Sequence, residues 1–170
     1  HGNPSDVIVS LAELVGATEV HMTADPTPRG RAVTGDVEAV LTQRKIDLVQ
    51  TGTPYAVPPG QVLNGSGTRY QVFTPFLRAW REHCGQDPFS EVDVDWMTGI
   101  ASDDLRVEGD TPAGELAALD RWREFCAHDL DGYATRRDRP DLDATSRLSA
   151  ALAFGEIHPR TMLADLAEVA

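Results

Sequence analysis

The sequence predicts an α/β segment followed by an all-helical segment. In residues 1–52, apolar residues recur at helical spacing and then in a short strand-like run, twice in succession. This helix–strand–helix–strand order favours a parallel sheet built of α and β units. In residues 111–170, apolar residues recur only at spacings of three and four, which predicts helices without strands. A stretch rich in proline and glycine, residues 53–110, is the predicted connector.

The first helix and strand have clear boundary signals. Asn3-Pro4 is typical of an N-cap followed by proline at the first helical position, and Gly16 can end the helix in a left-handed conformation. The alternating run at residues 19–23 predicts the first strand, which the turn-forming residues 25–28 should end.

A second helix is predicted over residues 36–44, with Val37, Val40 and Leu41 on one face, and a second strand over residues 46–50. Open parallel sheets usually have more than two strands and are covered on both faces. The sequence therefore predicts the second half of a Rossmann-like α/β domain, with His1 at an internal position of a longer protein.

The connector is predicted to hold one helix, which starts near Pro75 and carries Phe76, Leu77, Trp80 and Cys84. Apolar residues are expected to anchor the rest of it: Val57, Val62, Phe73 and Trp96. Asp103 and Asp104 form a pair of carboxylates. Because no histidine or third acid lies at ligand spacing, a solvated loop is expected there and no metal site is predicted.

The helical segment is predicted to begin with a long helix at Thr111-Pro112. Its apolar face is expected to consist of Leu116, Leu119, Trp122, Cys126, Leu130 and Tyr133. Two more helices are predicted, over residues 146–154 and 159–169, the second with His158 as a weak N-cap.

Composition and charge narrow the possible functions. The 170 residues, 41% hydrophobic and 25% charged, suffice for one domain with a core or for parts of two. No apolar run approaches the ~20 residues of a membrane span. A net charge of -12 argues against a protein that binds nucleic acid over its whole surface. Cys84 and Cys126 are expected to be buried thiols of a cytoplasmic protein, with a disulfide as the alternative.

Hydrogen-bond donors gather at residues 145–149, which read Thr-Ser-Arg-Leu-Ser where a new helix is expected to start. Free N–H groups at a helix N-terminus point outward and favour an anion. The hydroxyls and the Arg147 guanidinium add donors at the same place, so the pattern indicates a phosphate site. The alternative is a plain N-cap at Thr145 with Arg147 as a solvated surface residue.

A basic cluster at Arg136, Arg137 and Arg139 lies just before these residues. Asp138, Asp141 and Asp143 follow it closely, so the cluster is either a solvated turn with balanced charges or a local site for an anionic partner.

Two blocks of the sequence resemble the DNA photolyase/cryptochrome family. One block runs from Tyr133 through Arg137 and residues 145–149 to Gly155 and Pro159-Arg160; the other, residues 70–80, reads YQVFTPFLRAW. Both occur in the family's order. The resemblance implies an internal fragment: the end of the α/β antenna domain (1–52), the interdomain connector (53–110) and the start of the helical FAD-binding domain (111–170).

The resemblance implies that the chain has the function of this family. In photolyases, reduced FAD absorbs blue light and passes an electron to a pyrimidine dimer flipped out of the DNA duplex. The resemblance implies a carbon–carbon lyase, a deoxyribodipyrimidine photolyase, and assigns no catalytic residue to this chain. It implies that Arg137 contacts the DNA backbone and that six residues hold FAD, with the leucine acting through its backbone N–H: Tyr133, Thr145, Ser146, Arg147, Leu148 and Ser149. Alternatives are a cryptochrome-type blue-light receptor and a non-catalytic interaction module that keeps the fold.

The resemblance also implies an incomplete FAD pocket, so this chain alone is expected to be inactive. Relatives bind an antenna folate or deazaflavin partly through the loop after the first strand. Here that loop is residues 25–31, and the sequence departs from the family pattern at Thr34-Gly35-Asp36, so no antenna residue is assigned. Apolar faces built for burial are expected to lie open or to be covered by a second copy: Val20, Met22, Leu48, Leu152, Leu163 and Leu166.

Overall fold

The structure is a computed structural model that describes residues 2–84, 87–88, 90, 92–102 and 112–169. The chain divides into two compact units. The first consists of residues 1–83 and 95–104, and the second of residues 84–94 and 105–170.

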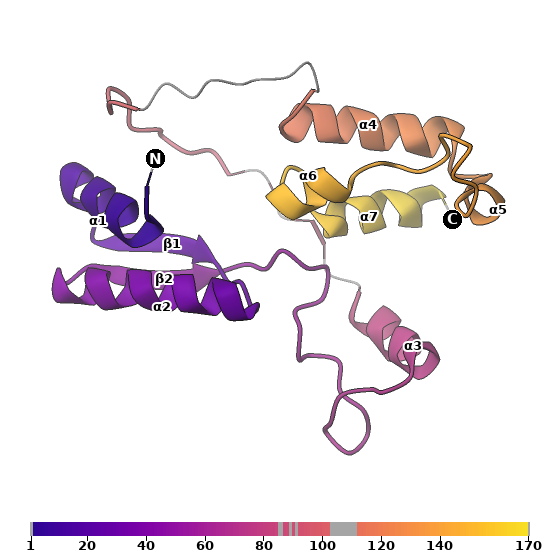
Figure 1. The fold of residues 1–170 in the computed structure, drawn as a ribbon, viewed down its shortest axis with the longest axis horizontal. Helices are drawn as coiled ribbons and strands as arrows, with labels where there is room; N and C mark the ends of the chain where they lie inside the picture. Colours follow the sequence, from indigo (N-terminus) through magenta and orange to yellow (C-terminus); the bar gives the residue numbers. More distant parts are fainter. Residues whose placement is uncertain (1, 85–86, 89, 91, 103–111, 170) are drawn as a thin grey trace. The chain divides into compact units, whose positions relative to one another are not determined.

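The first unit contains a two-stranded parallel sheet (Figure 1). The order of its first four elements is α1 (Pro4–Val15), β1 (Glu19–Thr23), α2 (Pro28–Gln43) and β2 (Asp47–Thr51). The strands pair in register from Glu19 with Asp47 to Thr23 with Thr51. The predicted pair of adjacent parallel strands is therefore confirmed, with the second strand one residue later than expected.

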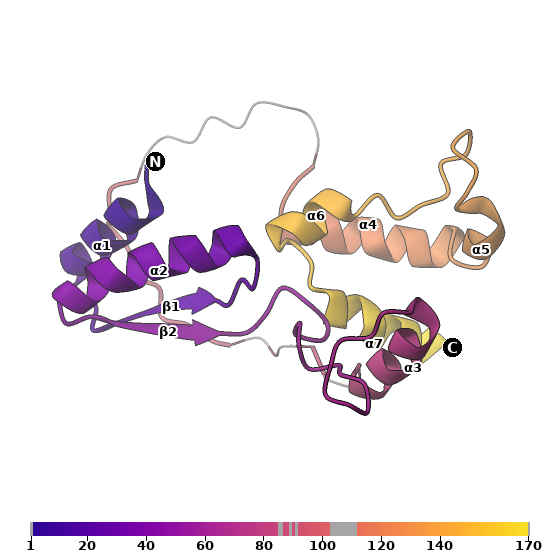
Figure 2. The same cartoon turned by 60° about the horizontal axis from the view of Figure 1, so that its bottom comes forward.

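One face of this sheet is covered by α1 and α2 (Figure 2). Val37 and Leu41 of α2 are 0% exposed, and they share a core with Val9 and Ala12 of α1 and with Ile46. From the strands, Val20, Met22 and Leu48 pack against this core. The alternate residues of β1, Glu19, His21 and Thr23, are exposed, as expected for a strand with period two that is buried on one face.

Caps explain where the two helices begin. The side chain of Asn3 accepts a hydrogen bond from the N–H of Ser5, and Gly16 ends α1 with φ 66°, as predicted. The predicted start of α2 at residue 36 is wrong, because the helix already begins at Pro28. There Thr27 accepts a hydrogen bond from the N–H of Gly30 at 3.0 Å, and the proline occupies the first turn.

The predicted connector, residues 53–110, contains α3 (Phe73–His83), which begins close to its predicted start. Val57 and Val62 are buried, as expected of anchors. Phe73 and Trp96 are 70% and 79% exposed, so their prediction as anchors is wrong. Phe73 opens a helix that has no buried residue, and Trp96 belongs to no helix or strand that could hold it against a core. Asp103 and Asp104 lie outside the described residues.

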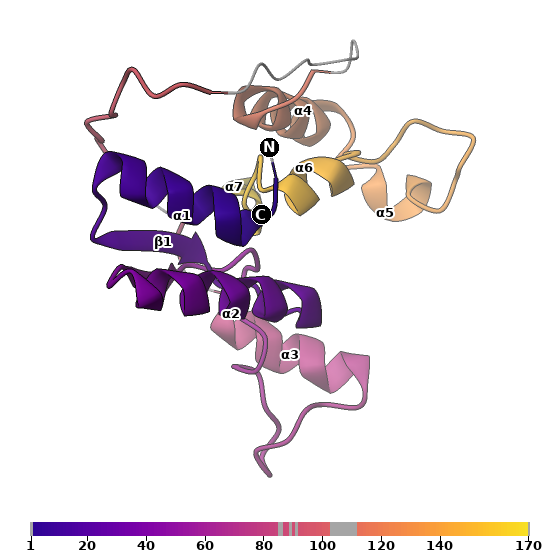
Figure 3. The same ribbon diagram turned by 60° about the vertical axis from the view of Figure 1, so that its left-hand side comes forward.

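The second unit is helical. Its helices are α4 (Glu115–His128), α5 (Tyr133–Arg136), α6 (Ser149–Phe154) and α7 (Pro159–Val169), and residues 112–169 contain no strand, as predicted. Figure 3 shows the long loop that joins α5 to α6. The predicted cap of α7 is also confirmed, since the N–H of Arg160 donates to Nδ1 of His158 at 3.2 Å.

The predicted extent of the long helix is wrong at both ends. Helix α4 begins at Glu115 after Gly114, and it ends at His128, so Leu130 and Tyr133 lie beyond it. Leu116 is 78% exposed, and the buried residues of α4 are Ala118, Trp122 and Phe125. The buried stripe therefore includes Phe125, one residue before the Cys126 of the predicted face.

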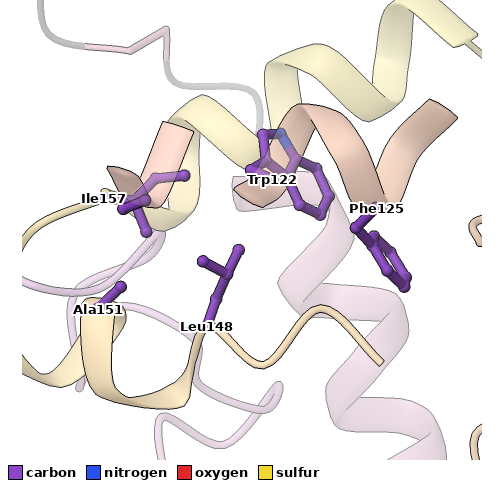
Figure 4. Close-up of a cluster of buried hydrophobic side chains, with 6 residues drawn as sticks. Trp122, Phe125, Leu148, Ala151 and Ile157 are labelled. Carbon is purple, nitrogen blue, oxygen red and sulfur yellow. The ribbon is translucent and has the colours of Figure 1, made fainter. Parts of the chain in front are cut away.

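The core of the second unit joins α4 to α6 and α7 (Figure 4). Leu148 points into the space between Trp122 and Ile157, with Ala151 beside it. The indole Nε1 of Trp122 donates to Oδ2 of Asp165 at 2.7 Å, which ties α4 to α7 by a charge-assisted hydrogen bond.

The apolar residues expected to lie open are all half-buried: Val20, Met22, Leu48, Leu152, Leu163 and Leu166. Self-association through these faces stays a prediction. Cys84 and Cys126 are half-buried and form no disulfide with each other. Burial raises the pKa of the Cys126 thiol, and the negative charge of Asp165 raises it further. None of the helices in the described ranges is long and apolar enough to cross a membrane.

Candidate functional site

The predicted FAD-binding residues lie mainly in one loop, residues 143–149, which leads into α6. Two buried side chains anchor it: Ala144 is 2% and Leu148 is 3% exposed. Between these anchors Thr145 and Arg147 are exposed and Ser146 is half-buried. The loop therefore has a fixed base, with polar residues on its outside.

The backbone of this loop has an unusual conformation at Arg147, whose φ is 53°. Leu148 follows with φ -89° and ψ 9°. A left-handed residue next to a right-handed one turns successive N–H groups toward the same side, which creates an anion-binding concavity. The N–H groups of Ser146, Arg147 and Leu148 donate to no other described residue. The loop therefore has three backbone donors that are not used within the described chain.

These donors lie where a helix starts, as the sequence predicts, but the predicted first residue of that helix is wrong. Helix α6 begins at Ser149 rather than Ser146, because the left-handed Arg147 cannot be part of a right-handed helix. The alternative of a plain N-cap at Thr145 is wrong as well. Leu148 occupies the N-cap position, and no side chain caps the helix.

The guanidinium of Arg147 is paired but accessible. Its Nε lies 2.8 Å from Oδ1 of Asp143, and the two side chains are 65% and 58% exposed. Exposed ion pairs contribute little because water screens them. An incoming anion can therefore bind this guanidinium, because breaking its ion pair with Asp143 loses little free energy.

Tyr133 is connected to the loop indirectly, through core residues that both contact. It is the first residue of α5, and its ring packs edge-on against Phe125, with centroids 5.6 Å apart. Phe125 also belongs to the core cluster that contains Leu148. Tyr133 and the loop therefore contact the same hydrophobic core. Tyr133 remains partly exposed.

Two of the three arginines of the basic cluster are held by neighbouring acids. Arg136 donates to the carbonyl of Asp129 and lies 3.3 Å from its carboxylate, with its own Nε buried and without a hydrogen-bond partner among the described residues. Arg139 binds Asp141 through two hydrogen bonds of 2.8 and 2.6 Å. Arg139 thereby lowers the pKa of Asp141, and Asp141 raises the pKa of Arg139.

Arg137 is the least engaged of these three arginines. Its Nε lies 3.7 Å from Asp138, which is beyond hydrogen-bond distance, and its side chain is 56% exposed. Its guanidinium is therefore available to an external anion.

An open groove borders the loop on the side of α4. Its volume is about 830 Å³, within the usual range for ligand pockets. Residues of α4, of the loop and of α6 line it, among them Leu116, Arg121, Glu124, Arg147 and Ala150.

Sequence analysis missed Arg121, whose side chain binds the loop backbone. Its Nε donates to the carbonyl of Ser146 and its Nη2 to the carbonyl of Thr145, both at 3.2 Å. The acceptors lie 24 and 25 residues away along the chain, so no local pattern could indicate them.

The comparisons with known proteins agree with the fold. The family model described as DNA photolyase matches residues 1–93. This chain belongs to the DNA photolyase family. A deoxyribodipyrimidine photo-lyase of Synechococcus sp. is 32% identical over 92% of the chain and 36% of its own length.

Solved structures of photolyase-family proteins also match. A bacterial class III photolyase from Agrobacterium tumefaciens has a TM-score of 0.75 at 28% identity, over 95% of this chain and 37% of its own. A cryptochrome of Synechocystis sp. has a TM-score of 0.73 over 98% of this chain and 39% of its own, and at 18% identity it shows the fold alone. The chain thus spans somewhat more than a third of these photolyase-family proteins.

Proposed function

We propose that this chain supplies part of the FAD-binding site of a deoxyribodipyrimidine photolyase, which uses light to repair pyrimidine dimers in DNA. The observation that carries this proposal is the 143–149 loop, whose backbone N–H groups at residues 146–148 have no acceptor in the described chain. Membership of the DNA photolyase family supports the identity of the ligand.

The donors of the loop fit a diphosphate. The N–H groups of Ser146, Arg147 and Leu148 and the guanidinium of Arg147 would hold the phosphate oxygens, with the hydroxyls of Thr145, Ser146 and Ser149 as further donors. Tyr133 would pack against the flavin from α5. The bound flavin supplies the light-driven electron for dimer cleavage. The residues of this chain bind and orient it.

Arg137 would contact the DNA backbone, since its guanidinium is exposed and only loosely paired. The division into α/β domain (1–52), connector (53–110) and flavin domain (111–170) belongs to the same proposal. A folate or deazaflavin antenna is compatible with it, with no residue assigned.

A cryptochrome-type light receptor is the second candidate, because the motifs of residues 70–80 and 133–160 resemble cryptochromes as well as photolyases. Repair of a defined pyrimidine dimer by the complete protein under blue light distinguishes the two. A photolyase removes the dimer only when illuminated, and a cryptochrome leaves it intact. A non-catalytic interaction module would bind no FAD.

Two substitutions in the complete protein test the assignment. Arg147→Ala removes a charge-assisted bond of about 1.5–3 kcal/mol, so FAD affinity should fall about ten- to a hundredfold. Arg137→Ala should weaken binding to damaged DNA and reduce its salt dependence, with flavin content unchanged, because one phosphate contact is lost. Flavin absorbance per protein and a salt titration of DNA binding measure both effects.

Arg139→Ala is the matched control, because Arg139 is an exposed arginine of the same segment that is already bound to Asp141. It should change neither flavin content nor DNA binding. If Arg147→Ala and Arg137→Ala lose flavin equally, or if neither loses anything, the separation of flavin and DNA contacts is wrong.

A further inference from the structure

Arg121 lies on α4, next to the buried Trp122, and its side chain is 30% exposed. Three of its nitrogens are engaged. Nε and Nη2 donate to the carbonyls of Ser146 and Thr145, and Nη1 donates to Glu124 at 2.9 Å. Glu124 therefore holds the guanidinium in place from its own helix, while the opposite edge binds two consecutive carbonyls of the 143–149 loop.

Because the peptide bond is planar, these contacts also fix the directions of the neighbouring N–H groups. In a trans peptide the carbonyl oxygen and the following N–H point in opposite directions. Because the carbonyls of Thr145 and Ser146 point toward Arg121, the N–H groups of Ser146 and Arg147 point away from it. Rotation of either peptide would turn a carbonyl, which repels a phosphate, to where a donor now lies.

Asp143 adds an electrostatic effect. Its carboxylate lies 3.9 Å from Nη2 of Arg121 and 2.8 Å from Nε of Arg147. Asp143 is therefore attracted to both Arg121 and Arg147. Without Arg121, Asp143 would face Arg147 alone and would compete more strongly with an incoming anion for that guanidinium.

We propose that Arg121 is a positioning residue for the flavin diphosphate. It does not touch the ligand. It fixes two peptides of the 143–149 loop so that their N–H groups face the phosphates, and it limits the hold of Asp143 on Arg147. This inference rests on the proposed function of the loop.

The test uses Arg121→Gln in the complete protein. The glutamine side chain is shorter and uncharged, and its single amide nitrogen replaces the two guanidinium nitrogens that now bind the two carbonyls. Loss of one to two hydrogen bonds should weaken FAD binding about tenfold, measured by fluorescence titration of the apoprotein. The phosphorus-31 resonances of bound FAD should shift, while the flavin absorption spectrum stays as in the wild type.

Arg123→Gln is the matched control. Arg123 lies on the same helix and pairs with Asp120 at 3.2 Å, with 69% of its side chain exposed. It should change neither FAD affinity nor the phosphorus resonances. If Arg121→Gln does not fold, Arg121→Lys serves instead, because an ammonium keeps the charge but lacks the fork that spans two carbonyls.

The outcomes separate the two proposals. Unchanged FAD affinity and phosphorus resonances in the Arg121 variant, with affinity lost in Arg147→Ala, would overturn the role of Arg121 and leave the flavin site standing. A lower Tm of the apoprotein together with unshifted phosphorus resonances would make Arg121 a general stabiliser, and the inference would be wrong. If the complete wild-type protein binds no FAD, the proposed function itself fails, and the inference with it.

Discussion

The region from α1 to β2 and the region from α4 to α7 are held together by different means. In the first, side-chain caps, a parallel ladder and a hydrophobic core determine the structure, with Val37 and Leu41 at 0% exposure. The second also has a hydrophobic core, but there side chains of α4 bind polar groups of α7 and of the 143–149 loop, whereas the long-range polar contact of the first is an exposed ion pair between Arg44 and Glu13. Trp122 binds Asp165, and Arg121 binds the carbonyls of the 143–149 loop.

The proposed function accounts for this difference, because the loop of the second region would have to present backbone donors to a phosphate. Residues inside a helix or between paired strands have their backbone groups bonded within the element, so few of those groups remain for a ligand. A loop that binds an anion needs open N–H groups, so its conformation must be held by other contacts. In this chain Arg121 and the buried side chains of Ala144 and Leu148 provide them.

The largest effect is expected in the first region. Leu41→Ala leaves a cavity at a fully buried position and should cost about 2–5 kcal/mol. Amide hydrogen exchange in α2 should then accelerate by at least about thirtyfold. Leu14→Ala is the control, because Leu14 on α1 is 71% exposed. Comparable acceleration by both substitutions would show that burial in this core does not determine stability.

A smaller effect is expected in the second region. Trp122→Phe keeps most of the apolar volume but removes the donor to Asp165, and a hydrogen bond to a charged group contributes about 1.5–3 kcal/mol. Hydrogen exchange in α4 and α7 measures the loss. Asp165→Asn keeps an acceptor oxygen and should cost less. If Trp122→Phe leaves hydrogen exchange in α4 and α7 unchanged, the hydrogen bond to Asp165 does not stabilise this region.

The smallest effect concerns two exposed side chains, Arg139 and Asp141. Arg139 holds the pKa of Asp141 below its ordinary value of 3.8, so Arg139→Ala should raise it. Because the folded pKa is depressed, the pair stabilises the fold above the unfolded pKa and loses that contribution as the pH falls through the folded pKa. An NMR titration of the Asp141 carboxyl carbon measures the shift. Arg137→Ala should leave that titration unchanged.

Much of the first region could be predicted because its signals are local. Asn3-Pro4 and Gly16 fix both ends of α1, and the alternation at residues 19–23 fixes β1. The start of α2 was missed although Thr27-Pro28 repeats the signal of Asn3-Pro4. Prolines at 26 and 28 together are typical of a turn, but Pro28 is the first residue of the helix.

The candidate site was predictable in composition but not in geometry. The five donor residues, 145–149, stand together in the sequence, yet the left-handed φ of Arg147 moves the start of α6 to Ser149. That conformation depends on contacts from α4, which no periodicity encodes. The exposure of Phe73 and Trp96 could not be predicted for the same reason, since burial depends on contacts with residues far along the chain.

Leu148 makes folding and ligand binding thermodynamically dependent on each other. Leu148 as a whole residue is 3% exposed in the helical core, and its backbone N–H is one of the loop donors that have no acceptor in the described chain. A ligand that binds this N–H also restrains the core side chain, and it binds only when that side chain is in place. By mass action, ligand at a hundred times its dissociation constant would add about 2.7 kcal/mol to the stability of the folded state. The same linkage means that loosening the core beneath Leu148 lowers the apparent affinity for the ligand, without any change in a group that touches it.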